Sequence, residues 1–285
     1  MSGMGFYLPR ALEEAVKLLA ADPDSKCLAG GATLVPMMNA GLVKPSALIS
    51  LRHVEGMQGI ERSAAGGVRI GAMTRHSETA ASVELAGGHR VVRCAASSIA
   101  SPPVRNMGTI GGSIAFADPA ADYPPALVAA DAEIETVGPN GPRRLKACEF
   151  FLDWYETALK PGEVIVAVHL PPASKGAVGH YDKLSRVEGD YATASVAVVL
   201  AMDKGVCNSI AIAVGACGPT PLRLAAAEQT LLGTRLDDGA LAVAGKRLAE
   251  TADPVDDVRA SADYRRLVIP RLIRRAVRSA MAELK

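Results

Sequence analysis

Two pairs of adjacent glycines are the part of this sequence best suited to binding a ligand. The first pair lies in AGGATLVP (29–36) and the second in TIGGSIAFADPAADYPP (109–125). In both segments an apolar run meets a helix-like stretch. Because glycine lacks a Cβ, backbone N–H groups there can converge on an anion, and the start of a helix adds further N–H groups. Two such loops facing each other could hold a pyrophosphate.

Hydroxyl groups accompany both glycine pairs. Thr33, Thr109 and Ser113 can donate hydrogen bonds to the same anion. Neither segment has the spacing of a G-x-G-x-x-G or a G-x-x-x-x-G-K-[ST] motif, which argues against a Rossmann or P-loop protein. Either pair taken alone also suits an ordinary tight turn, so on the residues alone the turn and the anion site both stay open.

Two aspartates follow the second glycine pair. Asp118 and Asp122 lie four residues apart, and each is close to a proline. A hard metal ion would need about six oxygen ligands, and no further carboxylates cluster nearby. The two side chains could instead cap turns or helix starts, which the prolines favour. In a third interpretation, one of them binds the hydroxyls of a polyol chain.

Other residue types that do chemistry are present without the required spacing. The five histidines have no metal-ligand spacing, the five cysteines form no C-x-x-C pair, and no serine lies in a G-x-S-x-G elbow. We therefore expect no metal ligand and no catalytic acid, base or nucleophile. The cysteines are expected to be free thiols in a reducing cytoplasm.

Composition excludes several classes of protein. Apolar residues make up 49% of the 285 positions, which is enough for a hydrophobic core and too many for a disordered chain. A net charge of +1 gives no overall field to attract nucleic acid or an anionic membrane. No run approaches the roughly 20 apolar residues of a spanning helix. The N-terminus also lacks the pattern of a secretory signal. We expect no transmembrane segment, no nucleic-acid partner and a cytoplasmic location.

Elements flanking the glycine pairs can be predicted from hydrophobic periodicity. Helical spacing over 11–20 and 33–40 and an apolar run over 47–51 predict a small β-α-β unit within the first 55 residues. Further elements are predicted as strands over 68–72, 133–137 and 163–170 and a helix over 91–100.

The C-terminal part begins after a stretch with the composition of a linker, Pro171-Pro172 followed by ASKGAVG. Strands over 195–202 and 206–214 are joined by a hairpin turn, and the pattern is helical from Pro221 to the end. We expect an α+β fold with two domains. Residues 1–175 form a ligand-binding domain with parts at about 1–55 and 56–175, the first a β-α-β unit and the second a mixed or antiparallel sheet. Residues 176–285 form a domain of antiparallel strands and a helix bundle.

The last predicted helix is rich in basic residues. Apolar side chains recur there at three- and four-residue steps, and the basic ones are Arg265, Arg266, Arg271, Arg274, Arg275, Arg278 and Lys285. Such a helix can bind a membrane or nucleic acid, meet an acidic partner surface, or pack on its own domain with a solvated basic face. The balanced overall charge favours the last interpretation.

Three ordered motifs resemble one protein family over essentially the whole chain. The motifs are AGGATLVPMM, TIGGSIAFADPAADYP and KLSRVEGDYATASVAVVL (183–200), and the ending YRRLVIPRLIRRAV accompanies them. They resemble the FAD-binding medium subunit of molybdenum hydroxylases, the carbon monoxide dehydrogenase and xanthine dehydrogenase group. The resemblance implies an FAD-binding oxidoreductase subunit. It does not identify a substrate.

The resemblance also implies roles for individual residues. The family's pyrophosphate loops fall on Ala29, Gly30, Gly31, Ala32 and Thr33 and on Thr109, Ile110, Gly111, Gly112 and Ser113. Its ribityl-binding aspartate falls on Asp122, and an aspartate–tyrosine pair near the isoalloxazine falls on Asp190 and Tyr191. Lys183 aligns with a basic residue near the flavin, and Ile99 with an apolar residue against the adenine.

Two positions depart from the family's pattern. The first loop commonly reads A-G-G-[HQ]-S, whereas this chain has Ala32 and Thr33, and the second commonly ends in Asn where this chain has Ser113. Both departures are expected to leave the backbone N–H donors intact. FAD binding is therefore expected to survive, with altered contacts to the phosphates.

The resemblance implies an electron-transfer subunit in a complex, as a dimer of heterotrimers. A large subunit would oxidise substrate at a molybdenum cofactor, and a small subunit would relay electrons through iron–sulfur clusters. FAD in this chain would pass them to an external acceptor such as NAD, a quinone or oxygen. Two alternatives are a self-sufficient flavin-dependent oxidase or reductase, with Tyr191 or Lys183 as acid or base, and a flavin-free scaffold subunit.

Overall fold

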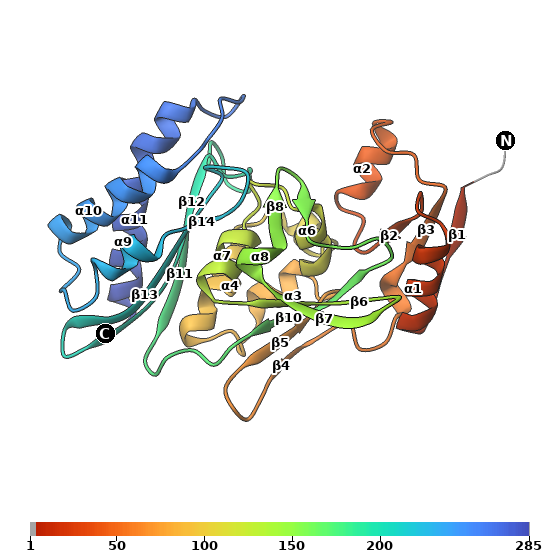
Figure 1. The fold of residues 1–285 in the computed structure, drawn as a ribbon, viewed down its shortest axis with the longest axis horizontal. Helices are drawn as coiled ribbons and strands as arrows, with labels where there is room; N and C mark the ends of the chain where they lie inside the picture. The colour runs from red at the N-terminus through yellow and green to blue at the C-terminus, as the bar shows by residue number, and fades with distance from the viewer. Residues whose placement is uncertain (1–3, 285) are drawn as a thin grey trace.

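A small parallel sheet with two helices forms the N-terminal end of the protein (Figure 1). The computed structural model describes residues 4–284. Strands β1 and β2 both pair in parallel with the central β3. The elements are β1 (Gly5–Tyr7), α1 (Leu12–Ala21), β2 (Lys26–Leu28), α2 (Leu34–Asn39) and β3 (Ala47–Ser50). The predicted β-α-β unit is confirmed, and β1 is a strand that the sequence pattern did not reveal.

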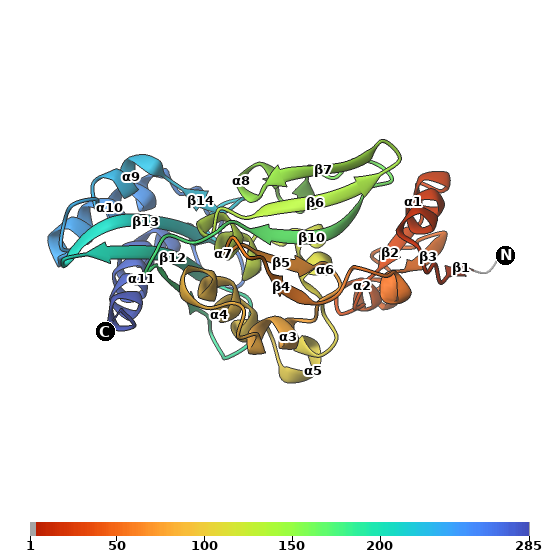
Figure 2. The ribbon, with the colours of Figure 1, turned by 90° about the horizontal axis from the view of Figure 1, so that it is seen from below.

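The middle of the molecule is a five-stranded antiparallel sheet in the order β4-β5-β10-β6-β7. Its strands are β4 (Ile60–Arg62), β5 (Val68–Gly71), β6 (Glu133–Gly138), β7 (Gly141–Lys146) and β10 (Val164–Leu170). The chain between β5 and β6 forms α3 (His76–Ala81), α4 (Arg90–Ser98), α5 (Pro102–Arg105), α6 (Ile110–Phe116) and α7 (Tyr123–Ala129). Helices α3, α4 and α5 gather along one side of the sheet (Figure 2).

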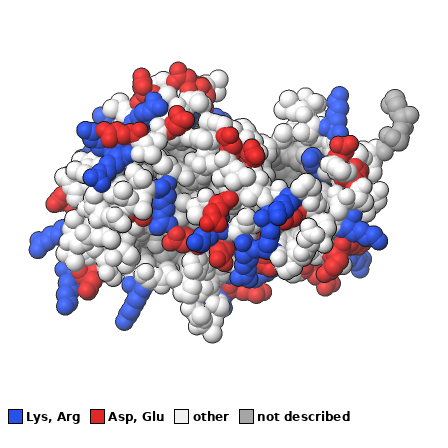
Figure 3. Space-filling view, viewed as in Figure 1, with Lys and Arg blue, Asp and Glu red and all other residues white. Residues whose placement is uncertain are grey.

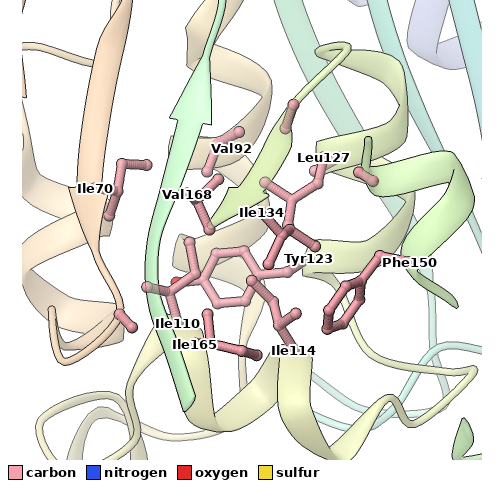
Figure 4. Close-up of a cluster of buried hydrophobic side chains, with 14 of the residues drawn as sticks. Ile70, Val92, Ile110, Ile114, Tyr123, Leu127, Ile134, Phe150, Ile165 and Val168 are labelled. Carbon is pink, nitrogen blue, oxygen red and sulfur yellow. The ribbon is translucent and has the colours of Figure 1, made fainter. Parts of the chain in front are cut away.

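Shorter elements complete this middle part. They are the 3₁₀ turns Leu51–His53 and Gly87–His89, helix α8 (Ala147–Phe150) and the two-stranded hairpin β8 (Phe151–Asp153) with β9 (Glu156–Thr157). Figure 4 shows the core between the sheet and the helices, in which Ile70 and Val168 from strands meet Ile110, Ile114 and Tyr123 from α6 and α7. This core fixes α6, whose first turn carries the second glycine pair.

The C-terminal part is a four-stranded antiparallel sheet covered by helices. Strands follow the order β11-β12-β13-β14, and the chain then continues into the helices. The elements are β11 (Val178–Leu184), β12 (Ala194–Asp203), β13 (Val206–Gly215), β14 (Leu222–Arg223), α9 (Ala225–Gln229), α10 (Asp238–Thr251) and α11 (Ala262–Ala282). The α+β fold with these parts is as predicted. Lys204 and Gly205 both have positive φ in the predicted hairpin turn.

Both faces of the β11–β14 sheet are covered. Alternate side chains of a strand point to opposite faces, so Val196 and Val198 of β12 join the core formed with α10 and α11, while Ala197 joins the core that contains α4 and α7. The backbones also approach closely. A Cβ added at Gly179 of β11 would lie 2.5 Å from the amide nitrogen of Val91 in α4. The C-terminal sheet is therefore shared between two cores.

Two sequence expectations were wrong in this region. The chain is not helical throughout from Pro221, because Leu222–Arg223 pairs with β13 and the segments 230–237 and 252–261 are irregular. Arg223 holds this strand by ion pairs with Glu228 and Asp131. Strand β11 was also missed, because its polar residues conceal the alternation and its first two residues lie in the predicted linker.

Helix α11 packs on its own domain through its apolar face. That face, which includes Ile269, Leu272 and Ile273, lies in the second core. Arg265 does not belong to a solvated basic face: it is 4% exposed and donates to the carbonyls of Thr193 and Ala216. Lys285 lies outside the described residues. Among residues 4–284, no helix is long and apolar enough to cross a bilayer.

Candidate functional site

The first glycine loop has backbone donors with no protein partner. It runs from the end of β2 to α2, where Gly31 has φ +77°, a conformation that favours glycine. Within the described range 4–284, the N–H groups of Gly30, Gly31, Ala32 and Thr33 donate to no protein acceptor. Ala29, Gly30 and Gly31 also line a hollow of about 380 Å³, flanked by Arg52 and His53. The loop can therefore present N–H donors to an anion.

The two glycine loops touch each other. A Cβ at Gly30 would overlap the backbone carbonyl of Met107, one residue before Gly108 and the second loop. A Cβ at Gly112 would lie 3.1 Å from Thr109 Oγ1 and 3.4 Å from Ala29 Cβ. Glycine at position 30 is thus required for the close approach of the loops, because any side chain there would displace backbone atoms.

The second loop differs from the first in its hydrogen bonds. The N–H groups of Ile110 and Gly111 donate to the carbonyls of Thr74 and Ala72, at 3.0 and 2.8 Å. The N–H of Gly112 donates to Thr109 Oγ1, which caps α6, and that of Ser113 donates to the Thr109 carbonyl. These four groups are already satisfied, in contrast to the expectation of free N–H donors in both loops. The second loop can still offer the hydroxyl hydrogens of Thr109 and Ser113 and the N–H of Thr109, which donates to no acceptor among residues 4–284.

Asp122 and Lys183 form a buried ion pair with Tyr181. Lys183 Nζ lies 3.0 Å from Asp122 Oδ1 and also donates to the Ser98 carbonyl at 2.7 Å. The Tyr181 hydroxyl donates to the same carboxylate at 2.7 Å. Burial raises the pKa of Asp122, and the positive charge of Lys183 and the two hydrogen bonds oppose this shift. Asp122 does not cap α7, although it stands at the capping position.

Asp190 and Tyr191 lie on the loop from β11 to β12. The Asp190 carboxylate accepts from the N–H of Tyr191, and the Tyr191 ring, 41% exposed, has the guanidinium of Arg259 5.2 Å from its centre. Burial and the negative charge of Asp118 raise the pKa of Tyr191 to about 12, so its hydroxyl stays protonated at neutral pH. Asp118 itself caps a turn by accepting from the N–H of Ala120 at 2.8 Å.

One short helix separates the glycine loops from the buried ion pair. Helix α6 begins within the second loop and ends at Phe116, shortly before Asp122, so its seven residues span roughly 10 Å. An anion-binding end and a polar end separated by such a helix suit an elongated ligand with a phosphate part and a polyol part. No three His, Cys, Asp or Glu side chains come together in the described part of the chain as a metal site would require.

Several residues of this region escaped the sequence analysis. Tyr181 could have been found, because residues two apart on a strand share a face and Tyr181 lies two before Lys183. No sequence pattern points to the other residues, because only the fold brings them to the site. They are Arg52, Ser98, Tyr155 and Arg259. Tyr155 lies beside Phe116, with ring centres 5.3 Å apart, and has φ +56°.

The buried His76 supports the second loop, and it should make the stability of the protein depend on pH. Its ring Nδ1 lies 3.2 Å from the Tyr123 hydroxyl, and its backbone N–H donates to the Gly108 carbonyl. Burial, with a smaller contribution from Arg105, lowers its pKa to about 4. Because only the unfolded chain binds a proton between the ordinary pKa and this value, stability falls as the pH falls. From pH 7 to pH 5 this residue alone should cost about 2 kcal/mol.

Urea unfolding at pH 7 and pH 5 measures this loss. His76→Gln should lose about 2 kcal/mol less than the unmodified chain over that interval. The matched control is His53→Gln, the same substitution at an exposed histidine. An equal pH dependence in all three chains would show that His76 titrates normally.

Comparisons with known proteins identify the family of this chain. A family described as "FAD binding domain in molybdopterin dehydrogenase" matches residues 2–173, and one described as "CO dehydrogenase flavoprotein C-terminal domain" matches residues 179–280. The carbon monoxide dehydrogenase medium chain of Afipia carboxidovorans is 37% identical over 98% of this chain and 97% of its own. Subunit alpha of the 6-hydroxypseudooxynicotine dehydrogenase complex of Paenarthrobacter nicotinovorans is 35% identical over 97% of this chain and 94% of its own.

A solved structure shows the same fold. The Cu,Mo-CO dehydrogenase in a cyanide-inactivated form has a chain with a TM-score of 0.94 and 38% identity, covering 99% of both chains. This chain belongs to the family of FAD-binding medium subunits of molybdenum hydroxylases. It is an oxidoreductase flavoprotein subunit, and its cofactor is FAD. Membership of a multi-subunit dehydrogenase family implies partner subunits.

The residues present fit this cofactor. The first loop has unpartnered N–H groups, and its glycine leaves room for a ligand to approach the backbone closely, which suits a pyrophosphate. The polar group at Asp122 suits a polyol. Ala32 keeps its N–H free, so the first departure from the family's pattern removes a side-chain contact only. The N–H of Ser113 donates to the Thr109 carbonyl within the loop. At this second departure the side chain therefore contributes only a hydroxyl group, where the family commonly has an amide.

Proposed function

We propose that this chain transfers electrons from the iron–sulfur clusters of a small partner subunit to an external acceptor. Substrate oxidation takes place at the molybdenum cofactor of a large subunit, in a dimer of heterotrimers. Bound FAD supplies the redox chemistry, which allows two-electron and one-electron partners to be linked. The family model that matches residues 2–173, an FAD-binding domain in molybdopterin dehydrogenase, supports this division of labour.

The observation that carries the proposal is the first glycine loop with its free N–H groups. In the proposed roles, Gly30, Gly31, Ala32 and Thr33 donate to the pyrophosphate, and Thr109 and Ser113 add hydroxyl donors. The second loop, through Ile110, Gly111 and Gly112, holds the first in place. Asp122 accepts from the polyol hydroxyls, and the positive charge of Lys183 favours the ionised form of its carboxylate. Tyr191, oriented by Asp190 and Arg259, lies toward the ring system and controls access to it.

The names of the relatives differ in substrate at similar identity. One is a carbon monoxide dehydrogenase and another acts in a 6-hydroxypseudooxynicotine dehydrogenase complex. We therefore infer the cofactor and the electron-transfer role for this chain, and assign the choice of substrate to a partner subunit. The acceptor we propose is NAD, a quinone or oxygen.

The first test is a visible spectrum of the purified chain, before and after addition of FAD, with the released cofactor identified by mass. We expect a flavin band that dithionite bleaches and an added acceptor restores. A colourless chain, both alone and within its co-purified complex, would support a flavin-free scaffold instead.

The relay itself is tested in the complex. After reduction by dithionite, complexes with and without this chain are mixed with NAD, menadione or oxygen, and reoxidation of the iron–sulfur clusters is followed. We expect faster reoxidation by one of these acceptors when the chain is present. Equal rates in both complexes would contradict the electron-transfer role, and substrate turnover by the chain alone would favour a self-sufficient oxidase.

A further inference from the structure

A groove lined by arginines lies on the C-terminal domain, away from the glycine loops. It has a volume of about 590 Å³ and is formed mainly by α11, with Leu184 at the end of β11 and Asp238 at the start of α10. Val268 and Leu272 give it an apolar floor, and Tyr264, 46% exposed, stands at one end. Neither the FAD site nor the proposed electron transfer uses this groove.

Four arginines line the groove along one face of α11. Arg271, Arg274, Arg275 and Arg278 are spaced as i, i+3, i+4 and i+7, so they share a face and extend over roughly 10 Å. All four are exposed. Their row is elongated, which suits an extended anionic segment better than a single phosphate group.

Only two of these arginines form an ion pair with a carboxylate among residues 4–284. Arg275 donates to Asp182 at 2.7 Å, and Arg278 donates to Asp238 at 3.0 Å. Arg271 and Arg274 form no ion pair or hydrogen bond with any residue from 4 to 284. The face seen in Figure 3 carries both basic and acidic side chains. In the groove, by contrast, the two arginines without a partner in the described chain lie one helical turn apart above an apolar floor.

We propose that this groove docks an acidic segment of a partner subunit, with carboxylates on Arg271 and Arg274 and an apolar side chain on the floor beside Tyr264. Guanidinium groups bind carboxylates in a bidentate manner, and an apolar contact next to them excludes water from these pairs. The inference rests on the proposed function, because that function requires partner subunits.

Membranes and nucleic acids fit the groove less well. Binding in a bilayer surface needs a free apolar helix face, and the apolar face of α11 is already buried in the second core. Nucleic acid binding depends on a broad excess of positive charge, and the net charge of the chain is +1. An acidic peptide requires neither.

The test compares two variants in the complex with its partner subunits. Arg271→Glu/Arg274→Glu reverses both unpaired charges, and Arg235→Glu reverses an exposed arginine outside the groove. Complexes are co-expressed, and the fraction assembled is measured by size-exclusion chromatography at low and high salt. We expect assembly of the double variant to fall at least tenfold, with Arg235→Glu unchanged, and a salt-sensitive wild-type complex. The milder Arg271→Gln/Arg274→Gln pair should show a smaller loss in the same direction.

Flavin content separates this inference from the proposed function. A double variant that is folded by circular dichroism and retains FAD, but does not assemble, supports docking at the groove. Full assembly of both double variants at every salt concentration overturns the docking inference and leaves the proposed function in place. Tighter, arginine-dependent binding of phosphatidylserine vesicles or polyuridylate than of a labelled Glu-Glu-Leu repeat peptide would also overturn it.

Discussion

Gly30→Ala is expected to yield a chain that purifies without its flavin. A methyl group at this position would overlap the Met107 carbonyl, a backbone atom that cannot rotate away. The two glycine loops must then separate, and the free N–H groups of the first loop move away from the phosphates. We expect at least a tenfold loss of bound FAD, together with a loss of about 1–3 kcal/mol in the free energy of unfolding from overpacking.

The controls for Gly30→Ala come from other glycines. Gly41 has φ +72° and open space around its Cβ position, so Gly41→Ala carries backbone strain without a clash and should keep its flavin. Gly112→Ala would meet Thr109 Oγ1 at 3.1 Å and should have an intermediate effect. Flavin content is measured from the ratio of visible to protein absorbance. Equal content in Gly30→Ala and Gly41→Ala would contradict the role of the loop contact.

Lys183→Met is expected to destabilise the chain by about 3–5 kcal/mol, because it leaves the Asp122 carboxylate buried and uncompensated. Both side chains of the pair are less than a tenth exposed, so solvent screens their attraction little. The double variant Lys183→Met/Asp122→Asn is the matched control. It removes both charges and keeps an acceptor for Tyr181, so it should recover most of the lost stability.

The effect of Lys183→Met should depend on pH. Burial already raises the pKa of Asp122 above its unfolded value, and loss of Lys183 raises it further. A raised pKa in the folded state means that stability is lost as the pH rises and the buried carboxyl ionises. The deficit measured by urea unfolding should therefore be larger at pH 8 than at pH 5. A deficit independent of pH would point to lost packing of the lysine side chain alone.

The sequence was most informative where a local rule decides the structure. Periodicity predicted the β-α-β unit, and the Asp203-Lys204-Gly205 turn predicted the hairpin, because these depend on neighbours in the chain. The glycine pairs pointed to both loops of the proposed site. The family resemblance brought in Asp122 and Lys183, which lie 61 residues apart and pair only in the fold.

What the sequence could not predict depends on contacts between distant segments. In the second loop, the N–H groups of Ile110 and Gly111 donate to the carbonyls of residues 74 and 72, and nothing near residue 110 indicates those partners. Arg265 was placed on a solvated face by helical periodicity, whereas it hydrogen-bonds carbonyls at the ends of β12 and β13. Strand β11 was hidden for a related reason, since Lys183 and Tyr181 are polar residues on its buried side.

The shared C-terminal sheet also decides which motions the protein has available. Strands β12 and β13 pack on α4 and α7 on one face and on the α10–α11 pair on the other, and Gly179 brings β11 against the backbone of α4. A hinge rotation between the two parts would have to pull these layers apart and expose both cores. A change of conformation that leaves both cores closed is therefore confined to surface loops, and the loop between β11 and β12 that carries Asp190 and Tyr191 is one of them.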